Sequence, residues 1–161
     1  MLTQARAKEL FDYDPETGIL SRIKKTSNAR LGPTSQRQMP SGHLVIRVDG
    51  KLYLTHRVIW LWMIGDLPEF IDHKDMSGAN NRWENLRECT KSQNAMNANK
   101  RRTSSSKWKG VWYRQKAGNW EARIGIGGAV RYLGVFDCPA AASFAYQIAA
   151  DKLHGEFARS A

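Results

Sequence analysis

Cysteine is scarce in this 161-residue sequence, which holds only two, Cys89 and Cys138. They are far apart, and no Cys-x-x-Cys pair exists to bind a metal ion. Zinc sites built from paired cysteines are thereby excluded, and no structural zinc is expected. We predict that both thiols are buried and reduced.

A long apolar run is also missing. The longest stretch, residues 58–64, is far shorter than the roughly 20 residues that span a bilayer. Residues 1–6 lead into no apolar signal core. The sequence therefore predicts a cytoplasmic protein with no membrane partner.

Acidic residues are absent from one long interval, between Glu88 and Glu121. Eight basic residues lie inside it: Lys91, Lys100, Arg101, Arg102, Lys107, Lys109, Arg114 and Lys116. With the net charge of +10, this stretch indicates a polyanionic partner, although charge alone does not separate nucleic acid from an acidic membrane. The polar run 103–106 has the composition of a linker. We predict a first domain over 1–100, a basic linker over 101–106 and a second domain over 107–161.

The first domain is expected to open with a small β-rich segment, residues 1–55, that contains a long loop over 28–41. In this segment Asp49-Gly50 is typical of a two-residue hairpin turn. A largely buried helix follows, capped by Thr55 and ended by Gly65. Beyond it the pattern predicts, in order, a strand over 69–73, a polar loop over 74–83, a strand over 85–89 and a helix capped by Ser92.

Four side chains beyond the buried helix carry chemistry: Asp72, His73, Asn85 and Asn94. Asn85 follows His73 by twelve residues, and Asn94 follows by nine more. A carboxylate holds a hard divalent cation through oxygen, and Asn94 offers a second, neutral oxygen ligand. The imidazole of His73, with an ordinary pKa of about 6.5, accepts a proton from water at neutral pH. The set indicates phosphodiester hydrolysis at one metal ion.

The residues around this set resemble the HNH endonuclease family over roughly positions 42–100. The segments that carry the resemblance are Ile71-Asp72-His73-Lys74-Asp75, Asn80-Asn81-Arg82-Trp83-Glu84-Asn85-Leu86-Arg87 and Ser92-Gln93-Asn94. The resemblance implies a ββα-metal fold in which Asp72 and Asn94 bind Mg²⁺ or Mn²⁺ and His73 is the general base. It further implies that Asn85 orients His73 through a hydrogen bond and braces the loop between the strands.

Two more residues of this region are candidates. Arg87 is a candidate phosphate clamp at the catalytic site, with a surface salt bridge as the alternative. His56, in the pair His56-Arg57 that recurs in the family, is expected to have a structural or phosphate-contacting role rather than to bind the metal.

The pattern after residue 107 predicts three antiparallel strands and one helix. Ala117-Gly118-Asn119 and Gly127-Gly128 mark two hairpin turns, and alternation along residues 120–126 gives one apolar and one polar face. Pro139 suits the first turn of the helix, which Gly155 ends. The predicted buried stripe of this helix is Ala141, Phe144, Ala145, Ile148 and Ala149.

This second domain resembles the AP2 DNA-binding domain through Lys109-Gly110-Val111-Trp112-Tyr113-Arg114, Gly118-Asn119-Trp120-Glu121-Ala122-Arg123-Ile124 and Tyr132-Leu133-Gly134-Val135-Phe136-Asp137. The resemblance implies that the face opposite the helix meets the major groove of double-stranded DNA. The residues expected to contact DNA are Lys109, Trp112, Arg114, Arg123 and Tyr132, with Lys100, Arg101 and Arg102 beside them. Trp112 and Gly125 stand where plant relatives have arginine, so no target sequence is carried over.

The sequence thus predicts an α+β protein. A ββα-metal module is preceded by a small β-rich segment and followed by a three-stranded antiparallel sheet with one helix. The expected function is that of a metal-dependent DNA endonuclease of the homing type found in phages and mobile elements, active as a monomer or homodimer in a bacterial host cell. The alternative is a DNA-binding regulator whose HNH fold is catalytically silent, which the intact set of four residues argues against.

Overall fold

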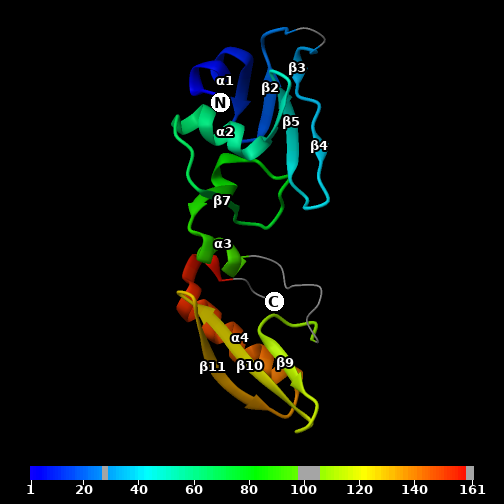
Figure 1. Ribbon diagram of the computed structural model, residues 1–161, viewed down its shortest axis with the longest axis vertical. Coiled ribbons are helices and arrows are strands. Elements are labelled where there is room, and N and C mark those ends of the chain that lie inside the picture. The colour runs from blue at the N-terminus through cyan, green and yellow to red at the C-terminus, as the bar shows by residue number, and fades with distance from the viewer. Residues whose placement is uncertain (27–28, 98–105, 159–161) are drawn as a thin grey trace. The chain divides into compact units, whose positions relative to one another are not determined.

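The computed structural model describes residues 1–26, 29–97 and 106–158. The chain forms two compact units, Met1–Cys89 and Thr90–Ala161 (Figure 1). The expected linker over 101–106 lies outside the described residues except for Ser106, as do the expected DNA contacts Lys100, Arg101 and Arg102. The predicted domain division therefore stays a prediction.

The first unit combines short strands with two helices. Its elements in chain order are α1 (Gln4–Leu10), β1 (Phe11–Asp14), β2 (Ile19–Arg22), β3 (Gly32–Pro33), β4 (Arg37–Gln38), β5 (Leu44–Val48), β6 (Lys51–Leu54), α2 (Thr55–Ile64), β7 (Phe70–His73), the 3₁₀ turn η1 (Trp83–Asn85) and β8 (Leu86–Cys89). The strands form three antiparallel sheets, β1-β2-β3, β4-β5-β6 and β7-β8. The segment expected to be a long loop thus contains β3 and β4.

One apolar core joins the β-rich segment to the β7-β8 hairpin. Helix α2 supplies its centre with Val58, Ile59 and Trp60, because every residue of the helix from Val58 onward is apolar. Leu10 and Ile71 reach the same core from α1 and β7. Helix α2 also packs against α1 (Figure 1). The N-terminal segment is therefore part of the scaffold that positions the hairpin.

Two turns of the first unit follow the sequence pattern. Asp49 and Gly50 both have positive φ, 46° and 82°, and join β5 to β6 with Val48 paired to Lys51. This is the geometry of a two-residue hairpin turn with a right-handed strand twist. Gly65 ends α2 at φ 92°, where an L-residue would be strained. Thr55 is the first residue of α2 rather than its cap, a position that Leu54 occupies.

The second unit holds α3 (Lys91–Asn97), β9 (Val111–Arg114), β10 (Asn119–Ile126), β11 (Ala129–Phe136), α4 (Pro139–His154) and the 3₁₀ turn η2 (Gly155–Phe157). The three strands form an antiparallel sheet with β10 in the middle, and α4 lies against one face of it (Figure 1). Pro139 starts α4 as predicted. The strands and helix expected after residue 107 are present, while a relation to the AP2 family stays a prediction.

The predicted buried stripe of α4 was wrong by about one position. The helix buries Ala142, Tyr146 and Ala150, whereas Phe144 and Ile148 are 64% and 54% exposed. Small alanines let the helix approach the sheet closely, and the Tyr146 ring packs so near Gly110 that a Cβ there would lie 2.2 Å from it. Close approach, not side-chain size, selects the buried face.

The cysteine prediction holds for one thiol only. Both cysteines are free, but Cys89 is buried and Cys138 is exposed. The Cys138 sulfur accepts a hydrogen bond from the Ala141 amide at 3.4 Å and so caps α4. Burial, with the nearby charge of Asp72, raises the pKa of Cys89 to about 11 and keeps it a thiol. Among the described residues, no helix has the length and apolar character of a membrane span.

Candidate active site

The β7-β8 hairpin places Asp72 opposite Arg87 and His73 opposite Leu86. The Arg87 guanidinium donates from Nε and Nη2 to the same carboxylate oxygen, Oδ2 of Asp72, at 2.9 and 2.8 Å. The side chains of Arg87 and Asp72 are only 10% and 7% exposed. This is a buried ion pair, not the surface salt bridge considered as the alternative for Arg87.

Asp72 and His73 are neighbours on a strand, so their side chains leave it on opposite faces. The carboxylate of Asp72 meets Arg87, while the imidazole of His73 points to a different set of partners. The two groups named as metal ligand and general base are therefore adjacent in sequence but lie in separate surroundings.

His73 is buried, with 4% of the residue exposed, and Asn81 fixes its imidazole. Its Nε2 lies 3.2 Å from Oδ1 of Asn81. Because an amide oxygen only accepts, His73 donates its proton from Nε2 and carries its lone pair on Nδ1. Burial lowers the pKa of His73, partly opposed by the Asn81 hydrogen bond and the charges of Asp75 and Asp72. The result is a neutral imidazole at neutral pH.

The β1-β2 hairpin in turn holds Asn81. The Tyr13 hydroxyl donates to the Asn81 carbonyl at 2.7 Å, and burial, with the charge of Asp14, raises the pKa of that phenol so that it stays a donor. The Trp83 amide donates to the Pro15 carbonyl at 3.0 Å. A Cβ on Gly18, whose φ is +75°, would lie 2.7 Å from the Asn81 carbonyl carbon. The loop is locked against this turn.

Asn85 braces the loop between the strands but does not orient His73. Its amide nitrogen donates to Oδ1 of Asp75 at 2.9 Å and to the Asn80 carbonyl at 2.8 Å, and its oxygen accepts from the Asp75 amide at 3.0 Å. The expected hydrogen bond to His73 was wrong, because these bonds engage the whole Asn85 amide; Asn81, which sequence reasoning missed, makes that bond instead.

Asp75 is the acceptor on which the loop closes. Burial works to raise the pKa of Asp75, but hydrogen bonds from the Asn80 side chain, the Ser77 amide and the Asn85 side chain outweigh it and leave the pKa below its ordinary value. A carboxylate with this many donors stays ionised. Hydrogen bonds to Asp75 therefore hold together the loop of residues 74–82, which also carries Asn81.

Three histidines converge beside this loop. The ring centroids of His56 and His73 are 5.0 Å apart, those of His43 and His56 are 5.2 Å apart, and those of His43 and His73 are 5.5 Å apart. One ring nitrogen from each lies within 4.8 Å of the other two. Sequence reasoning missed His43, which lies just before β5, while His56 lies just after the partner strand β6, in the first turn of α2.

His56 is the most strongly perturbed of the three. It is 5% exposed, and its Nδ1 has no hydrogen-bond partner in the described part of the chain. Burial, reinforced by His73, His43 and Arg57, lowers the pKa of His56 to about 3. The side chain is therefore neutral at any physiological pH.

Asn94 lies on α3, which belongs to the second unit. The helix is capped by Thr90 rather than by Ser92: the Gln93 amide donates to the Thr90 hydroxyl at 3.2 Å, and the Thr90 amide donates back to Gln93 Oε1 at 2.8 Å. This reciprocal pair is a capping box. Joint metal binding by Asn94 and Asp72 stays a prediction.

The sheet face opposite α4 carries several of the expected DNA contacts. Trp112 and Tyr132 are 42% and 58% exposed, and Arg123 pairs with Tyr132 across the sheet. Glu121 stands between the arginines, 3.8 Å from Arg114 Nε and in an ion pair with Arg123. These residues share one exposed, mixed aromatic and basic face.

Lys109 departs from this face. It precedes β9, and its ammonium group donates to the Met96 carbonyl at the end of α3. A cation at a helix C-terminus is stabilised by the helix dipole. Through this hydrogen bond Lys109 connects the segment before β9 to α3, within the second unit.

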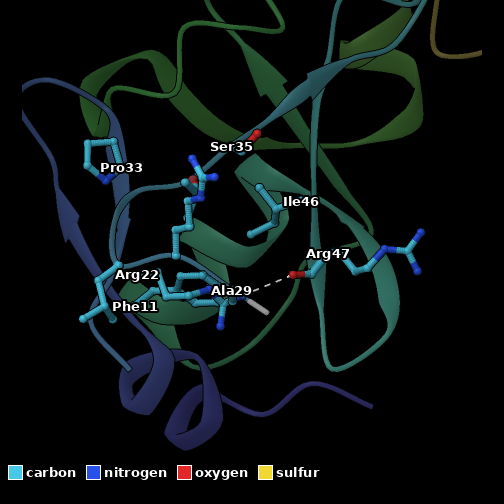
Figure 2. Close-up of a pocket in the computed structure, with 10 residues that line it drawn as sticks. Phe11, Arg22, Ala29, Pro33, Ser35, Ile46 and Arg47 are labelled. Carbon is cyan, nitrogen blue, oxygen red and sulfur yellow. Dashed lines mark hydrogen bonds between the residues drawn. The ribbon is translucent and has the colours of Figure 1, made fainter. Parts of the chain in front are cut away.

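The first unit also has a cavity of about 560 Å³ near Arg22 and Arg47 (Figure 2). Arg22 is largely buried, donates to Thr26 Oγ1 and the Arg47 carbonyl at 3.1 and 3.3 Å, and stacks 4.6 Å from the Phe11 ring centre. Among the described residues, the lining of this cavity contains no histidine or carboxylate. The described lining thus offers no imidazole or carboxylate as a general base, and the candidate active site is the hairpin.

Residues 53–96 match the family described as HNH endonuclease. The match covers less than half of the chain, and it includes Asp72, His73, Asn85 and Asn94. Comparison with curated proteins and with solved structures gave no match. The family match supports a nuclease, and enzymes of this family generally use a divalent metal ion.

Proposed function

We propose that the protein is a metal-dependent DNA endonuclease of the homing type, with Asp72 and Asn94 as metal ligands and His73 as general base. The observation that carries the proposal is the HNH family match over a braced hairpin that bears Asp72 and His73. An AP2-like second unit would hold the duplex.

The donor set fits a hard cation. Asp72 and Asn94 offer a carboxylate and an amide oxygen, which are ligands for Mg²⁺ or Mn²⁺. The buried Asp72 carboxylate supplies the negative charge, and a bound ion would share that carboxylate with its present partner Arg87. When bound, the ion supplies charge stabilisation at the phosphate and at the departing 3′ oxygen.

Arg87 has a second role in this scheme. Its guanidinium holds the Asp72 carboxylate in place with two donors, and guanidinium groups recognise phosphate oxygens equally well. Arg87 would keep Asp72 paired before DNA binds and donate to the scissile phosphate afterwards. Its role is to position Asp72 and to clamp the phosphate.

His73 would take the proton from the attacking water on Nδ1. The hydrogen bond from Nε2 to Asn81 fixes that tautomer, and burial keeps the ring neutral. Because the ring is 4% exposed, water must reach it through a small displacement of the loop or of His43. DNA binding would supply that displacement.

The outer face of the β9-β10-β11 sheet would contact the duplex. Exposed Arg114 and Arg123 suit phosphate oxygens, and Glu121 holds both in one row. Trp112 and Tyr132 add apolar surface for base edges or sugar. The negative charge of Glu121 would also repel DNA phosphates. It would therefore weaken binding to DNA that makes no specific contact with this face.

The test is cleavage of supercoiled plasmid in Mg²⁺ or Mn²⁺, with EDTA and His73→Ala as controls. Open-circle or linear DNA from the parent protein, absent in both controls, supports the enzyme and separates nicking from double-strand cutting. A gel shift in EDTA must show that His73→Ala still binds DNA. Binding without cleavage on a plasmid library of random inserts would support the silent regulator instead.

A further inference from the structure

We propose that His43, His56 and His73 form a binding site for a borderline transition-metal ion, with zinc as the preferred ion, and that its occupation switches off cleavage by engaging His73. Its nitrogen ligands differ from the proposed oxygen ligands Asp72 and Asn94. The inhibition, unlike the metal binding, rests on the proposed nuclease function.

The ligand chemistry distinguishes the two sites. Imidazole nitrogen is a ligand for zinc, copper, nickel and iron, whereas Mg²⁺ prefers carboxylate, amide and water oxygens. The cluster contributes three nitrogens within 4.8 Å of one another. Three protein nitrogens with one open position are a common zinc arrangement.

The distances are close to those of a bound site. Two nitrogens about 2.05 Å from a tetrahedral ion lie about 3.3 Å apart, so binding would draw the rings together by at most about 1.5 Å. The ring planes are inclined to one another by 53° to 87°. Non-parallel rings can direct lone pairs to one central point, which stacked rings cannot.

The polar atoms of the cluster support a ligand. His56 Nδ1 is buried and has no partner among the described residues, and a buried polar atom left without a partner is unfavourable. Asn81 accepts from His73 Nε2, which leaves the lone pair on Nδ1. The Ser41 hydroxyl lies 3.1 Å from His43 Nδ1 and leaves Nε2 for an ion. Fixing a metal-binding histidine through its other nitrogen is typical of metal sites.

The scaffold holds the three rings from three elements. His56 lies in the first turn of α2, His73 ends β7, and His43 precedes β5. Gly78 lets the loop approach His43, since a Cβ there would lie 2.9 Å from the His43 amide nitrogen. His43 is half-buried and the other two are buried, so an ion would enter past His43.

Metal binding is tested first without DNA, on untagged, EDTA-treated protein. Co²⁺ is titrated and its visible absorption recorded, and Zn²⁺ is then added to displace it. We expect one Co²⁺ per chain with the spectrum of a tetrahedral nitrogen site, displaced by equimolar Zn²⁺ and unaffected by excess Mg²⁺. Absence of a stoichiometric site, or its displacement by Mg²⁺, would overturn the proposal.

Single substitutions then locate the site. His43→Gln and His56→Gln should each weaken Co²⁺ binding by about tenfold or more, and Asn81→Ala by about 10- to 100-fold. The chain has four histidines, so His154→Gln is the matched control and should bind as the parent does. Far-ultraviolet circular dichroism confirms folding, and His43, being half-buried, gives a variant that folds even if His56→Gln does not. Equal affinity in parent and His43→Gln would refute the assignment.

Inhibition is measured for each protein as the ratio of its cleavage rates with and without Zn²⁺. Plasmid cleavage in Mg²⁺ is measured with and without equimolar Zn²⁺, and the ratio of the two rates is compared between parent and His43→Gln. We expect Zn²⁺ to stop the parent reversibly, with recovery on chelation, and to affect His43→Gln about tenfold less. Zinc bound by the cluster with an unchanged rate would overturn the inhibition. A chain that binds Co²⁺ at the cluster but never cleaves would refute the nuclease function and leave the metal site standing.

Discussion

Acidification should weaken the first unit through His56. Burial lowers its folded-state pKa from 6.5 to about 3. Because the folded pKa lies below the unfolded one, the unfolded chain binds more protons as pH falls. The stabilising contribution is complete above pH 6.5 and is lost progressively between pH 6.5 and about pH 3.

The magnitude follows from the two pKa values. Well below pH 6.5 the free energy of unfolding falls by about 1.4 kcal/mol per pH unit, and between about pH 7 and pH 5 the loss from His56 is about 2 kcal/mol. His56 is 5% exposed, so solvent screening reduces this figure little. His73, whose pKa is also lowered by burial, acts in the same direction.

Hydrogen exchange of the α2 amides in EDTA isolates the first unit. The opening free energy of these amides is measured at about pH 5 and pH 7 in the parent and in His56→Phe, which keeps a ring but does not titrate. We expect the pH-dependent loss to be smaller in His56→Phe by about 2 kcal/mol. Parallel losses in both proteins would refute the placement of a neutral His56 in the core.

Three further changes test the hairpin and the sheet face. Gly18→Ala should destabilise the first unit by at least about 1 kcal/mol in urea unfolding, because φ is +75° and the new Cβ would lie 2.6 Å from the Arg82 amide nitrogen; unchanged stability would contradict that contact. Arg87→Met removes the cationic partner of the buried Asp72 carboxylate and should lower stability by about 3 kcal/mol or more, and adding Asp72→Leu should restore most of it; no recovery would argue against the ion pair. Arg114→Ala should lower the slope of log affinity against log salt for DNA by about one, as removal of one phosphate contact does; an unchanged slope would exclude that contact.

The sequence predicted elements whose signals are local. The turn at Asp49 and Gly50 set the β5-β6 register, and Gly65 set the end of α2. The buried face of α4 could not be read in this way, because apolar residues surround much of that helix and several faces satisfy the period. The buried face is the one that carries Tyr146, whose ring packs directly against Gly110. That contact joins residues far apart in the sequence and can be seen only in the folded structure.

The site residues also divide into those set by local sequence signals and those set by contacts between distant segments. Asp72 and Arg87 could have been paired from sequence, since a hairpin with Asp72 and Arg87 at equal distances from its loop sets them side by side. Asn81 could not have been preferred over Asn85 as the partner of His73, because both lie in one polar loop. Its selection depends on the contact between the loop and the β1-β2 turn, which brings together residues more than sixty positions apart.

The histidine cluster combines a predictable pair with an unpredictable third member. The two-residue turn at Asp49 fixes the pairing of Val45 with Leu54, and His43 and His56 lie just beyond these paired ends of β5 and β6. His73 reaches this pair only because α2 and β7 share one apolar core. Hydrophobic packing that positions the hairpin therefore also brings the proposed general base against two further imidazoles. A nuclease built this way would have its catalytic proton acceptor open to the ions that imidazole nitrogen prefers, whereas its oxygen-ligand site suits Mg²⁺ or Mn²⁺.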